Sequence, residues 1–276
     1  MKSVIADPAT RVICLRSVAR SGTTVRLTQY PIDLVMSNGD VYLSASGYTF
    51  SGLSSSTSMS PSLIDLEGIV GLAGIGRDEL SSGVFDGARC FLFATSWAAP
   101  VVDEEPMVKS IFGKTTIKDD LYVIEEMSLL DALGQSVGLT VTPTCWKRFG
   151  SVECGKDIGP LTVTGALTHV TDAYTLRDSA RAEADDYFGA GTIAFTSGPN
   201  AGLRPIDISA YSADGTITLQ EPPYYPVTVG TSYSMIPGCR KREIEDCQAK
   251  WANRINCGAF SNVPTQSVYT TTGGIG

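Results

Sequence analysis

The sequence has few of the side chains on which most catalytic and metal centres rely. Its 276 residues include a single histidine, His169, which excludes any metal site built from two histidines of the chain. A Ser-His-Asp or Cys-His mechanism would also have to use His169. This residue lies in the run Ala-Leu-Thr-His-Val-Thr, which has the composition of a strand, so we expect a structural histidine there.

Cationic side chains and long apolar runs are also scarce. The chain has 21 Lys and Arg against 29 Asp and Glu, a net charge of −8. This balance disfavours binding to duplex DNA or anionic membranes, because phosphate contacts need clustered Lys and Arg. No apolar run approaches the roughly 18 residues of a membrane span, and the first residues do not resemble a signal peptide. We therefore expect a globular protein that is made in a reducing cytoplasm.

Most of the chain has the pattern of a mainly β protein. Short runs rich in Val, Ile, Thr, Tyr and Phe alternate with turn clusters. The Asn38-Gly39 pair predicts a type I′ turn, because Gly tolerates positive φ and Asn is the residue that most often accompanies it. The predicted strands are Val12–Arg20 with Thr24–Gln29, Ile32–Met36 with Val41–Ala45, Ala88–Trp97, Ser110–Ile117, and Ile206–Tyr211 with Thr216–Gln220.

Few helices are expected. Short ones are predicted at Arg77–Ser82 and at Met127–Leu133. The strongest candidate is Lys241–Arg254, whose spacing would place the apolar side chains on one face; these are Ile244, Cys247, Trp251 and Ile255. We expect a β-rich domain over residues 1–142, a second over 143–264, and a loose tail over 265–276.

Five of the seven cysteines follow this domain boundary. Cys145 and Cys154 are nine residues apart, Cys239 and Cys247 are eight apart, and 84 residues that look β-rich separate the two pairs. A metal held by both pairs would close a long loop and so stabilise the fold. Four thiolates suit either Zn²⁺ or an iron–sulfur cluster, and these spacings do not decide between them.

The other cysteines have a simpler interpretation. Cys14 and Cys90 lie inside apolar strand-like runs, so we expect ordinary core residues. Cys257 is expected to be a buried apolar residue as well, with a fifth, spare thiol near the site as the alternative. Cationic residues flank the four candidate ligands and would either balance thiolate charge or form a solvated basic patch; they are Lys147, Arg148, Lys156, Arg240, Lys241 and Arg242.

Several runs resemble a family of phage tail proteins. They are Asp-Tyr-Phe-Gly at 186–189, Ala-Phe-Thr-Ser-Gly-Pro-Asn-Ala-Gly at 194–202, Pro-Gly-Cys at 237–239, and the run from Cys247 to Phe260. The chain is identified by them as similar to the DUF2163 and phage BR0599 family of tail tip or baseplate hub proteins, found in siphophages and gene transfer agents. These are similar in role to the tail tip protein L of phage lambda. Weaker matches extend the resemblance through the N-terminal half.

The resemblance implies a [4Fe–4S] cluster with Cys145, Cys154, Cys239 and Cys247 as ligands. Zinc in the same place is the alternative. The chain departs from the family at Cys257, where an aromatic residue is usual. We interpret Cys257 as a packing substitution, and a ligand swap stays open.

The resemblance also implies the fold and the role. The fold would be a barrel-like or sandwich-like β hub domain followed by a β-rich iron–sulfur domain with a short helix near the C-terminus. The protein would be a structural part of the virion tail tip, made in the bacterial host cytoplasm. Its partners would be its own copies in a homotrimer ring, the distal tail protein, and the central fibre or host-recognition protein. No membrane or sequence-specific nucleic acid is expected.

The competing class is a tail-associated cell-wall hydrolase. It would need His169 beside a cysteine, or a carboxylate pair such as Glu104-Glu105 or Asp185-Asp186. Each of these pairs lies in a run of like charge, which is typical of a solvated loop. We therefore expect no enzymatic activity.

Overall fold

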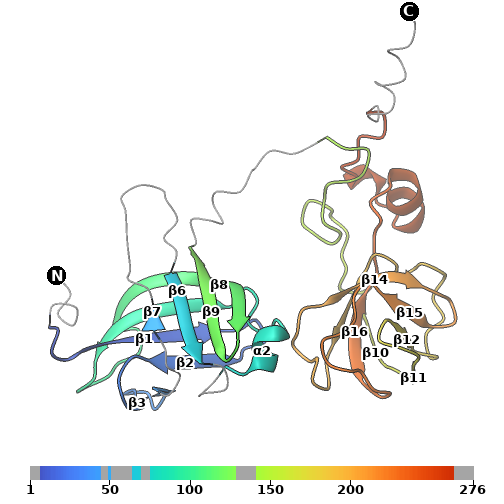
Figure 1. The fold of residues 1–276 in the computed structure, drawn as a ribbon. Helices are drawn as coiled ribbons and strands as arrows, with labels where there is room; N and C mark the ends of the chain where they lie inside the picture. Colours follow the sequence, from blue (N-terminus) through green and yellow to red (C-terminus); the bar gives the residue numbers. More distant parts are fainter. Residues whose placement is uncertain (1–6, 45–48, 51–63, 70–74, 129–140, 264–276) are drawn as a thin grey trace, which may run out of the picture. The chain divides into compact units, whose positions relative to one another are not determined.

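The computed structural model describes residues 7–44, 49–50, 64–69, 75–128 and 141–263. The chain forms two compact units, Met1–Ser136 and Val137–Gly276, whereas the boundary expected from the sequence follows residue 142. Both units are built mainly of antiparallel strands (Figure 1), as predicted. No helix within the described residues is long and apolar enough to cross a membrane.

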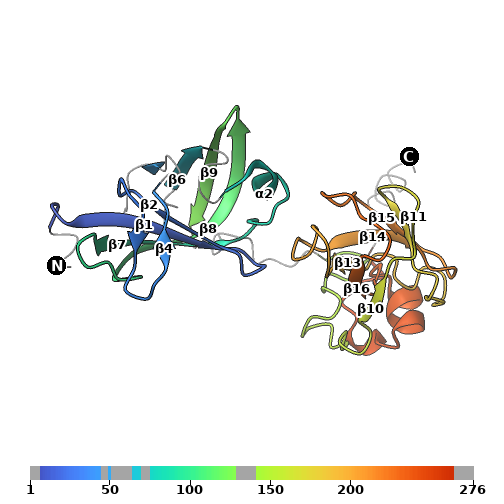
Figure 2. The ribbon, with the colours of Figure 1, turned by 90° about the horizontal axis from the view of Figure 1, so that it is seen from below.

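The N-terminal unit contains one seven-stranded antiparallel sheet in the order β2-β1-β7-β8-β9-β6-β5. Two views show that this sheet is strongly curled (Figures 1 and 2). A short helix, α2 (Arg77–Ser81), lies where it was predicted. The strands are β1 (Arg11–Val18), β2 (Thr24–Thr28), β3 (Leu34–Val35), β4 (Val41–Tyr42), β5 (Thr49–Phe50), β6 (Ile64–Ile69), β7 (Arg89–Ser96), β8 (Glu105–Lys118) and β9 (Leu121–Ser128).

Both faces of strand β1 are buried, because each face meets a different layer. Leu15 packs into the main core, together with Leu80 of helix α2. Cys14 faces the other way and packs with Tyr42 of the separate β3–β4 hairpin. Cys14 and Cys90 are both buried core residues, as predicted.

The β3–β4 hairpin forms at the predicted place with a different turn. Gly39 has φ +87, while Asn38 is not among the residues with positive φ. The Gly39 N–H donates to Met36 O at 2.9 Å, and the Met36 N–H donates to Asp40 O at 2.9 Å. These bonds define a three-residue loop, a type I turn followed by a left-handed glycine. The predicted type I′ turn is therefore wrong, although glycine has the role expected of it.

The C-terminal unit is a closed antiparallel barrel in the order β10-β16-β13-β14-β15-β12-β11. Residues 167–168 join β10 to β11 and close it: Leu167 N–H donates to Thr231 O and Thr168 N–H to Arg177 O. The large apolar side chains fill its interior. The strands are β10 (Val163–Ala166), β11 (His169–Val170), β12 (Thr175–Arg177), β13 (Thr192–Phe195), β14 (Ile206–Tyr211), β15 (Thr216–Leu219) and β16 (Ser232–Ile236), followed by η1 (Glu243–Lys250) and η2 (Arg254–Asn256).

The predicted strand pairs β1–β2 and β14–β15 and the predicted strands β7 and β8 are all present. The predicted helix over Met127–Leu133 is wrong at its start, because Met127 and Ser128 belong to β9. Pairing with β8 extends that strand past the point where the apolar spacing turns helical. The rest of that prediction, and the tail beyond residue 263, lie outside the described residues.

A buried carboxylic acid lies inside the N-terminal sheet. Glu126 on β9 is 2% exposed. The Ser110 hydroxyl donates to its Oε2 at 2.5 Å, while Oε1 has no hydrogen-bond partner among the described residues. Burial raises the pKa of Glu126, and the Ser110 hydrogen bond offsets this only in part. Ionisation of Glu126 therefore opposes folding.

Glu126→Gln should remove this effect. When the pKa of a carboxyl is raised in the folded state, the protein loses stability as pH rises from the pKa of the unfolded chain, about 4.3, towards the pKa of the folded protein. The variant should gain on the wild type in free energy of unfolding by ~1.4 kcal/mol for each pH unit above about 4.3, until the raised folded pKa of Glu126 is reached. Urea unfolding followed by hydrogen exchange in β8 and β9 measures this. Glu125→Gln on the exposed face is the matched control. Parallel pH profiles for Glu126→Gln and wild type would refute the interpretation.

Candidate functional site

The two cysteine-bearing segments lie at the same end of the C-terminal barrel. We call residues 143–158 the first loop and residues 237–263 the C-terminal segment. Figure 1 draws both at one end of the barrel, the first loop in yellow-green and the C-terminal segment in orange-red. All seven strands of the barrel lie between Cys154 and Cys239, so the predicted β-rich insert is confirmed.

Hydrogen bonds to backbone carbonyls join the first loop to the C-terminal segment. The Lys147 ammonium donates to Asn256 O at 2.6 Å, and the Lys156 ammonium donates to Trp251 O at 3.0 Å. The Cys145 N–H donates to Lys241 O at 2.8 Å. Lysine ammonium groups and a backbone N–H thus hold together the two segments that carry the cysteines.

Asn253 is the buried residue that connects two of the cysteines. Its side-chain amide donates to Cys154 O at 2.7 Å and lies 3.6 Å from Cys154 Sγ. Its backbone carbonyl accepts from the Cys247 thiol at 3.7 Å. Asn256 in turn donates to Asn253 Oδ1 at 2.8 Å, which fixes the orientation of the amide. Sequence reasoning missed this residue because asparagine carries no spacing signal of its own.

The remaining thiols share this neighbourhood. The Gly258 N–H donates to Cys145 Sγ at 3.3 Å. Burial raises the pKa of Cys239, a Lys241 N–H hydrogen bond opposes this, and nearby acidic groups, including Cys145 and Cys154, raise it further.

Cys247 is perturbed most strongly. Burial, a hydrogen-bonding contact with Cys257, and the proximity of Cys239 and Cys145 raise its pKa to about 12. The neighbouring cysteines therefore oppose the ionisation of Cys239 and Cys247. A bound cation would relieve this repulsion.

The cysteines lie in neighbouring segments, but their side chains do not converge on one position. Among the described residues, no group of three or more His, Cys, Asp or Glu side chains is arranged to hold a metal ion. The donor set nevertheless has the chemistry of a four-thiolate site, since thiolates suit Zn²⁺ and iron–sulfur clusters. N–H groups at Cys145, Cys154 and Cys239 add donors of the kind that stabilise thiolates. Cys145, Cys154, Cys239, Cys247 and Cys257 are the side chains available to such a group.

The predicted helix over Lys241–Arg254 takes another form. Residues Glu243–Lys250 form a π-helix, in which Cys247 N–H bonds to Arg242 O and Trp251 N–H bonds to Asp246 O, five residues back. This wider spacing moves side chains off the face predicted for 3.6 residues per turn. Cys247 and Trp251 are buried as predicted, whereas Ile244 is 56% and Ile255 95% exposed. The predicted apolar face is wrong for those two isoleucines.

Trp251 fixes the C-terminal segment to both the first loop and the barrel. Its ring lies 4.8 Å from Phe149 and 5.7 Å from Tyr187, measured between ring centroids. The Lys250 ammonium lies over the Tyr187 and Trp251 rings and donates to Asp186 O at 2.8 Å. Aromatic and cation–π contacts of this kind stabilise by about 1 kcal/mol each.

Two of the flanking cationic residues form ion pairs with carboxylates. Arg240 pairs with Asp186 at 2.6 Å, and Arg242 pairs with Asp246 at 3.0 Å. Arg148 and Lys241 line a hollow of about 220 Å³ beside Cys239. Arg240 and Arg242 are thus paired with carboxylates, and the balancing of thiolate charge by the other flanking cations stays a prediction.

The residues of the competing hydrolase interpretation do not assemble. His169 is exposed on β11, and its described contact is with Thr168 Oγ1 at 3.1 Å. Glu105 is buried, unlike the solvated loop residue expected, because it pairs at the start of β8. Glu104 accepts from Thr95, and Asp185 accepts from the Ala213 N–H.

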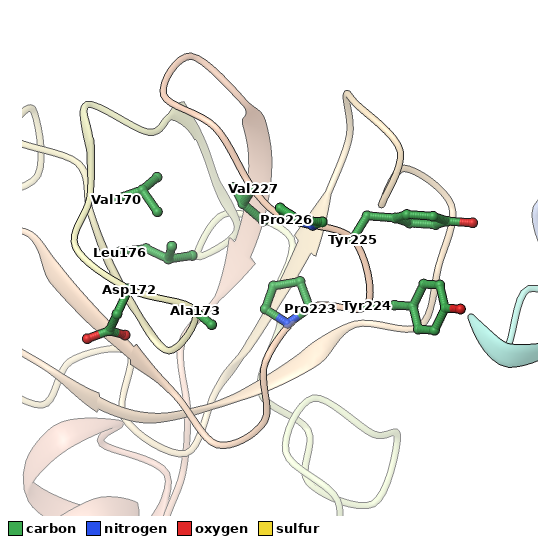
Figure 3. Close-up of a pocket in the computed structure, with 9 residues that line it drawn as sticks. All are labelled: Val170, Asp172, Ala173, Leu176, Pro223, Tyr224, Tyr225, Pro226 and Val227. Carbon is green, nitrogen blue, oxygen red and sulfur yellow. The ribbon is translucent and has the colours of Figure 1, made fainter. Parts of the chain in front are cut away.

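A second hollow, of about 250 Å³, lies on the barrel. Figure 3 shows its apolar side chains, with the Tyr224 and Tyr225 rings extending away to one side. Its one acid, Asp172, accepts the N–H groups of Tyr174 and Thr175 at 2.7 Å each. Asp172 thus serves its own turn, and this hollow has no second carboxylate to act with it.

Close backbone packing holds Cys239 in place. A Cβ on Gly238 would lie 2.1 Å from Gly189 O and 2.2 Å from Gly191 N. Gly238→Ala should therefore move the residues before Cys239 and cost roughly 1–3 kcal/mol of unfolding free energy. Urea unfolding and the alkylation rate of Cys239 measure both effects. Gly159→Ala is the control, since its Cβ meets only the end of the Asp157 side chain. Equal stability of the two variants would contradict the packing argument.

Comparison with known proteins identifies the family. A family model described as "Baseplate hub protein, N-terminal attachment domain" matches residues 2–157, and one described as "Phage conserved hypothetical protein BR0599" matches residues 186–267. No curated protein matches the chain. A solved chain from "Virion of native gene transfer agent (GTA) particle" has the same fold, with a TM-score of 0.84, 23% identity, and coverage of 97% of this chain and 93% of that chain. The first model spans more than half of the sequence, and the chain belongs to the family of phage baseplate hub proteins.

Proposed function

We propose that this baseplate hub protein works at the tail tip of a phage or gene transfer agent, stabilised by a [4Fe–4S] cluster on Cys145, Cys154, Cys239 and Cys247. The observation that carries the cluster is that segments before and after the barrel strands bring these cysteines to one end of the barrel, where hydrogen bonds join the segments. We assign the cluster a structural role, since the thiols' partners within the described part of the chain are N–H groups and a backbone carbonyl.

The proposed place in the virion follows from the family and the fold. The matched model is described as an attachment domain of a baseplate hub protein. The solved chain of the same fold comes from a gene transfer agent particle. By analogy, copies of this chain would form a homotrimeric ring that joins the distal tail protein to the central fibre or host-recognition protein. Synthesis in the host cytoplasm would keep the thiols reduced for metal binding.

A bound iron–sulfur cluster supplies metal–thiolate bonds that cross-link the chain. The surrounding residues orient those thiolates. The Gly258 N–H faces Cys145 Sγ, the Asn253 amide faces Cys154 Sγ, and the Lys241 N–H faces Cys239. Donors at the sulfurs stabilise their charge and help to set the potential of such a group.

The cross-link would act as a clip on the barrel. It would close a loop that spans the 84 residues between Cys154 and Cys239. One cross-link across a loop of that size stabilises by ~4 kcal/mol on chain-entropy grounds. The lysine–carbonyl bonds from Lys147 and Lys156 already hold the same two segments together, so less entropy is lost when the cluster binds.

Cys145→Ser or Cys239→Ser should abolish metal binding and lower the stability of the barrel. The full chain would be purified without oxygen, and iron, acid-labile sulfide, zinc and the visible spectrum would be measured. We expect brown wild-type protein with iron and sulfide in equal amounts, and colourless variants. Cys14→Ser, in the N-terminal core, is the control and should keep the metal.

A colourless wild-type protein that contains zinc would replace the cluster with the zinc alternative and leave the clip intact. Wild-type protein without any metal, with unchanged stability in Cys145→Ser, would overturn the clip itself.

His169→Ala should leave particle assembly and infectivity unchanged. The side chain is exposed on β11 and adjoins only Thr168 among its described contacts. Every histidine-dependent mechanism of the chain needs this residue, since it is the only histidine. Plaque or transfer assays on particles that carry the variant measure the effect. A loss of infectivity with normal assembly would favour a hydrolase.

A further inference from the structure

We propose that the N-terminal unit binds an extended, acidic segment of a neighbouring tail protein on the face of strands β7 and β8 that carries Phe91. We call this the Phe91 face. The docking surface consists of two hollows that share Phe91 and Lys109, and Arg89 lines the larger of them. This inference rests on the proposed function, because it takes the chain to be assembled with other tail proteins. It adds the surface that one of them contacts and the chemistry of the contacting segment.

The β3–β4 hairpin covers only part of the Phe91 face. Phe93 is buried against Tyr42 of the hairpin, with 5.6 Å between the two ring centroids. Side chains alternate along a strand, so Phe91 and Arg89 lie on the same face as Phe93. Phe91 is only half-buried and Arg89 is exposed. Within the described part of the chain, the face next to Phe91 is therefore accessible.

Strand pairing surrounds Phe91 with cations. Phe91 pairs with Lys109 of β8, and Arg89 pairs with Ile111; directly paired residues of an antiparallel sheet share a face. The Lys109 ammonium lies 5.7 Å from the centroid of the Phe91 ring. The Arg16 guanidinium, from strand β1, lies 4.7 Å from the same centroid. The Phe91 face thus combines an aromatic ring with cations from three strands.

Two of these three cations have no carboxylate partner. Arg16 pairs with Asp103 at 2.6 Å. By contrast, the side chains of Arg89 and Lys109 form no ion pair or hydrogen bond with the described residues. The chain has 29 acidic residues against 21 Lys and Arg, and its net charge is −8. Arg89 and Lys109 therefore form a local positive charge on an acidic protein, and this charge is available to a partner of opposite sign.

Two hollows extend from the Phe91–Lys109 pair in opposite directions along the strands. The larger, of about 410 Å³, extends to Arg89, and the smaller, of about 230 Å³, extends to Pro106. A β-bulge in the pairing of β7 with β8 lies at the smaller hollow, and such bulges interrupt the regular ladder. An extended chain advances about 3.3 Å per residue, so a segment of roughly four residues would span both hollows.

The chemistry of this surface fits an acidic polypeptide. Carboxylates of the segment would pair with Arg89 and Lys109, and an apolar side chain would fill the larger hollow against Phe91 and Ile111. A second copy docked through the same face is disfavoured, because a twofold contact would bring the same cations together. Duplex DNA is disfavoured as well, since two unpaired cations are too few for phosphate binding and the face also carries Asp103.

The first test reverses the charge of the docking surface. Arg89→Glu/Lys109→Glu should lower the plaque or transfer titre of particles at least tenfold, because carboxylates would then face carboxylates. Arg89→Lys/Lys109→Arg keeps both charges and should stay within about twofold of the wild type. Arg20→Glu/Lys118→Glu is the matched control, since it changes the net charge equally at exposed positions that line neither hollow. Equal titres of the first variant and this control would overturn the proposal.

The second test identifies the segment and does not depend on charge reversal. The photoreactive residue p-benzoylphenylalanine would replace Ile111 in assembled particles, and cross-linked peptides would be identified by mass spectrometry. We expect a cross-link to a segment rich in Asp and Glu from a different tail protein. A cross-link to a basic segment, to another copy of this chain or to DNA, or no cross-link, would overturn the proposal. Particles that lack this chain altogether would show that the proposed function fails, and the docking surface would fail with it.

Discussion

Hydrogen bonds to backbone carbonyls hold the first loop against the C-terminal segment, and the arrangement of the cysteines depends on these bonds. Lys147 and Lys156 extend from the first loop to Asn256 O and Trp251 O. In the opposite direction, the Asn253 amide of the C-terminal segment donates to Cys154 O in the first loop. The pairing of β10 with β16 already brings the chain flanking Cys154 close to the chain flanking Cys239, and these bonds then hold the two cysteine-bearing segments against each other. A buried carbonyl without a donor costs about 1–3 kcal/mol, so the carbonyls also hold the lysines in place.

The barrel itself gives this connection a rigid base. Its closed sheet and filled interior form a complete core next to the cysteines. Trp251 carries the C-terminal segment onto that base through Phe149 and Tyr187. The close approach at Gly238 then directs the chain from β16 into Cys239. The site is therefore an extension of the fold, and a metal would tighten an arrangement that the chain has already made.

Local sequence patterns were enough to predict the parts of the fold that depend on local chemistry. Alternating apolar runs and glycine turns located the β1–β2, β3–β4 and β14–β15 hairpins. The predictions failed where the backbone adopts a hydrogen-bond pattern other than the commonest one for its sequence. Asn38-Gly39 forms a type I turn with a left-handed glycine, and Ile244 is exposed where a π-helix changes the period. Ile255 is exposed because the helix ends at Lys250, before this residue. Cysteine spacing indicated the candidate site, whereas Asn253 and the lysine–carbonyl bonds arise only from tertiary structure.

We propose that a four-thiolate iron–sulfur cluster cross-links the segments that precede and follow the C-terminal barrel of this hub protein. N–H groups donate to Cys145 Sγ and lie near Cys154 Sγ, and the raised pKa values of Cys239 and Cys247 would be relieved by a bound cation. The most direct measurement is the iron and acid-labile sulfide content of the full chain purified without oxygen. We expect equal amounts of iron and sulfide in the protein, together with a visible iron–sulfur absorption band. Colourless protein with zinc in place of iron, or with no metal, would contradict it.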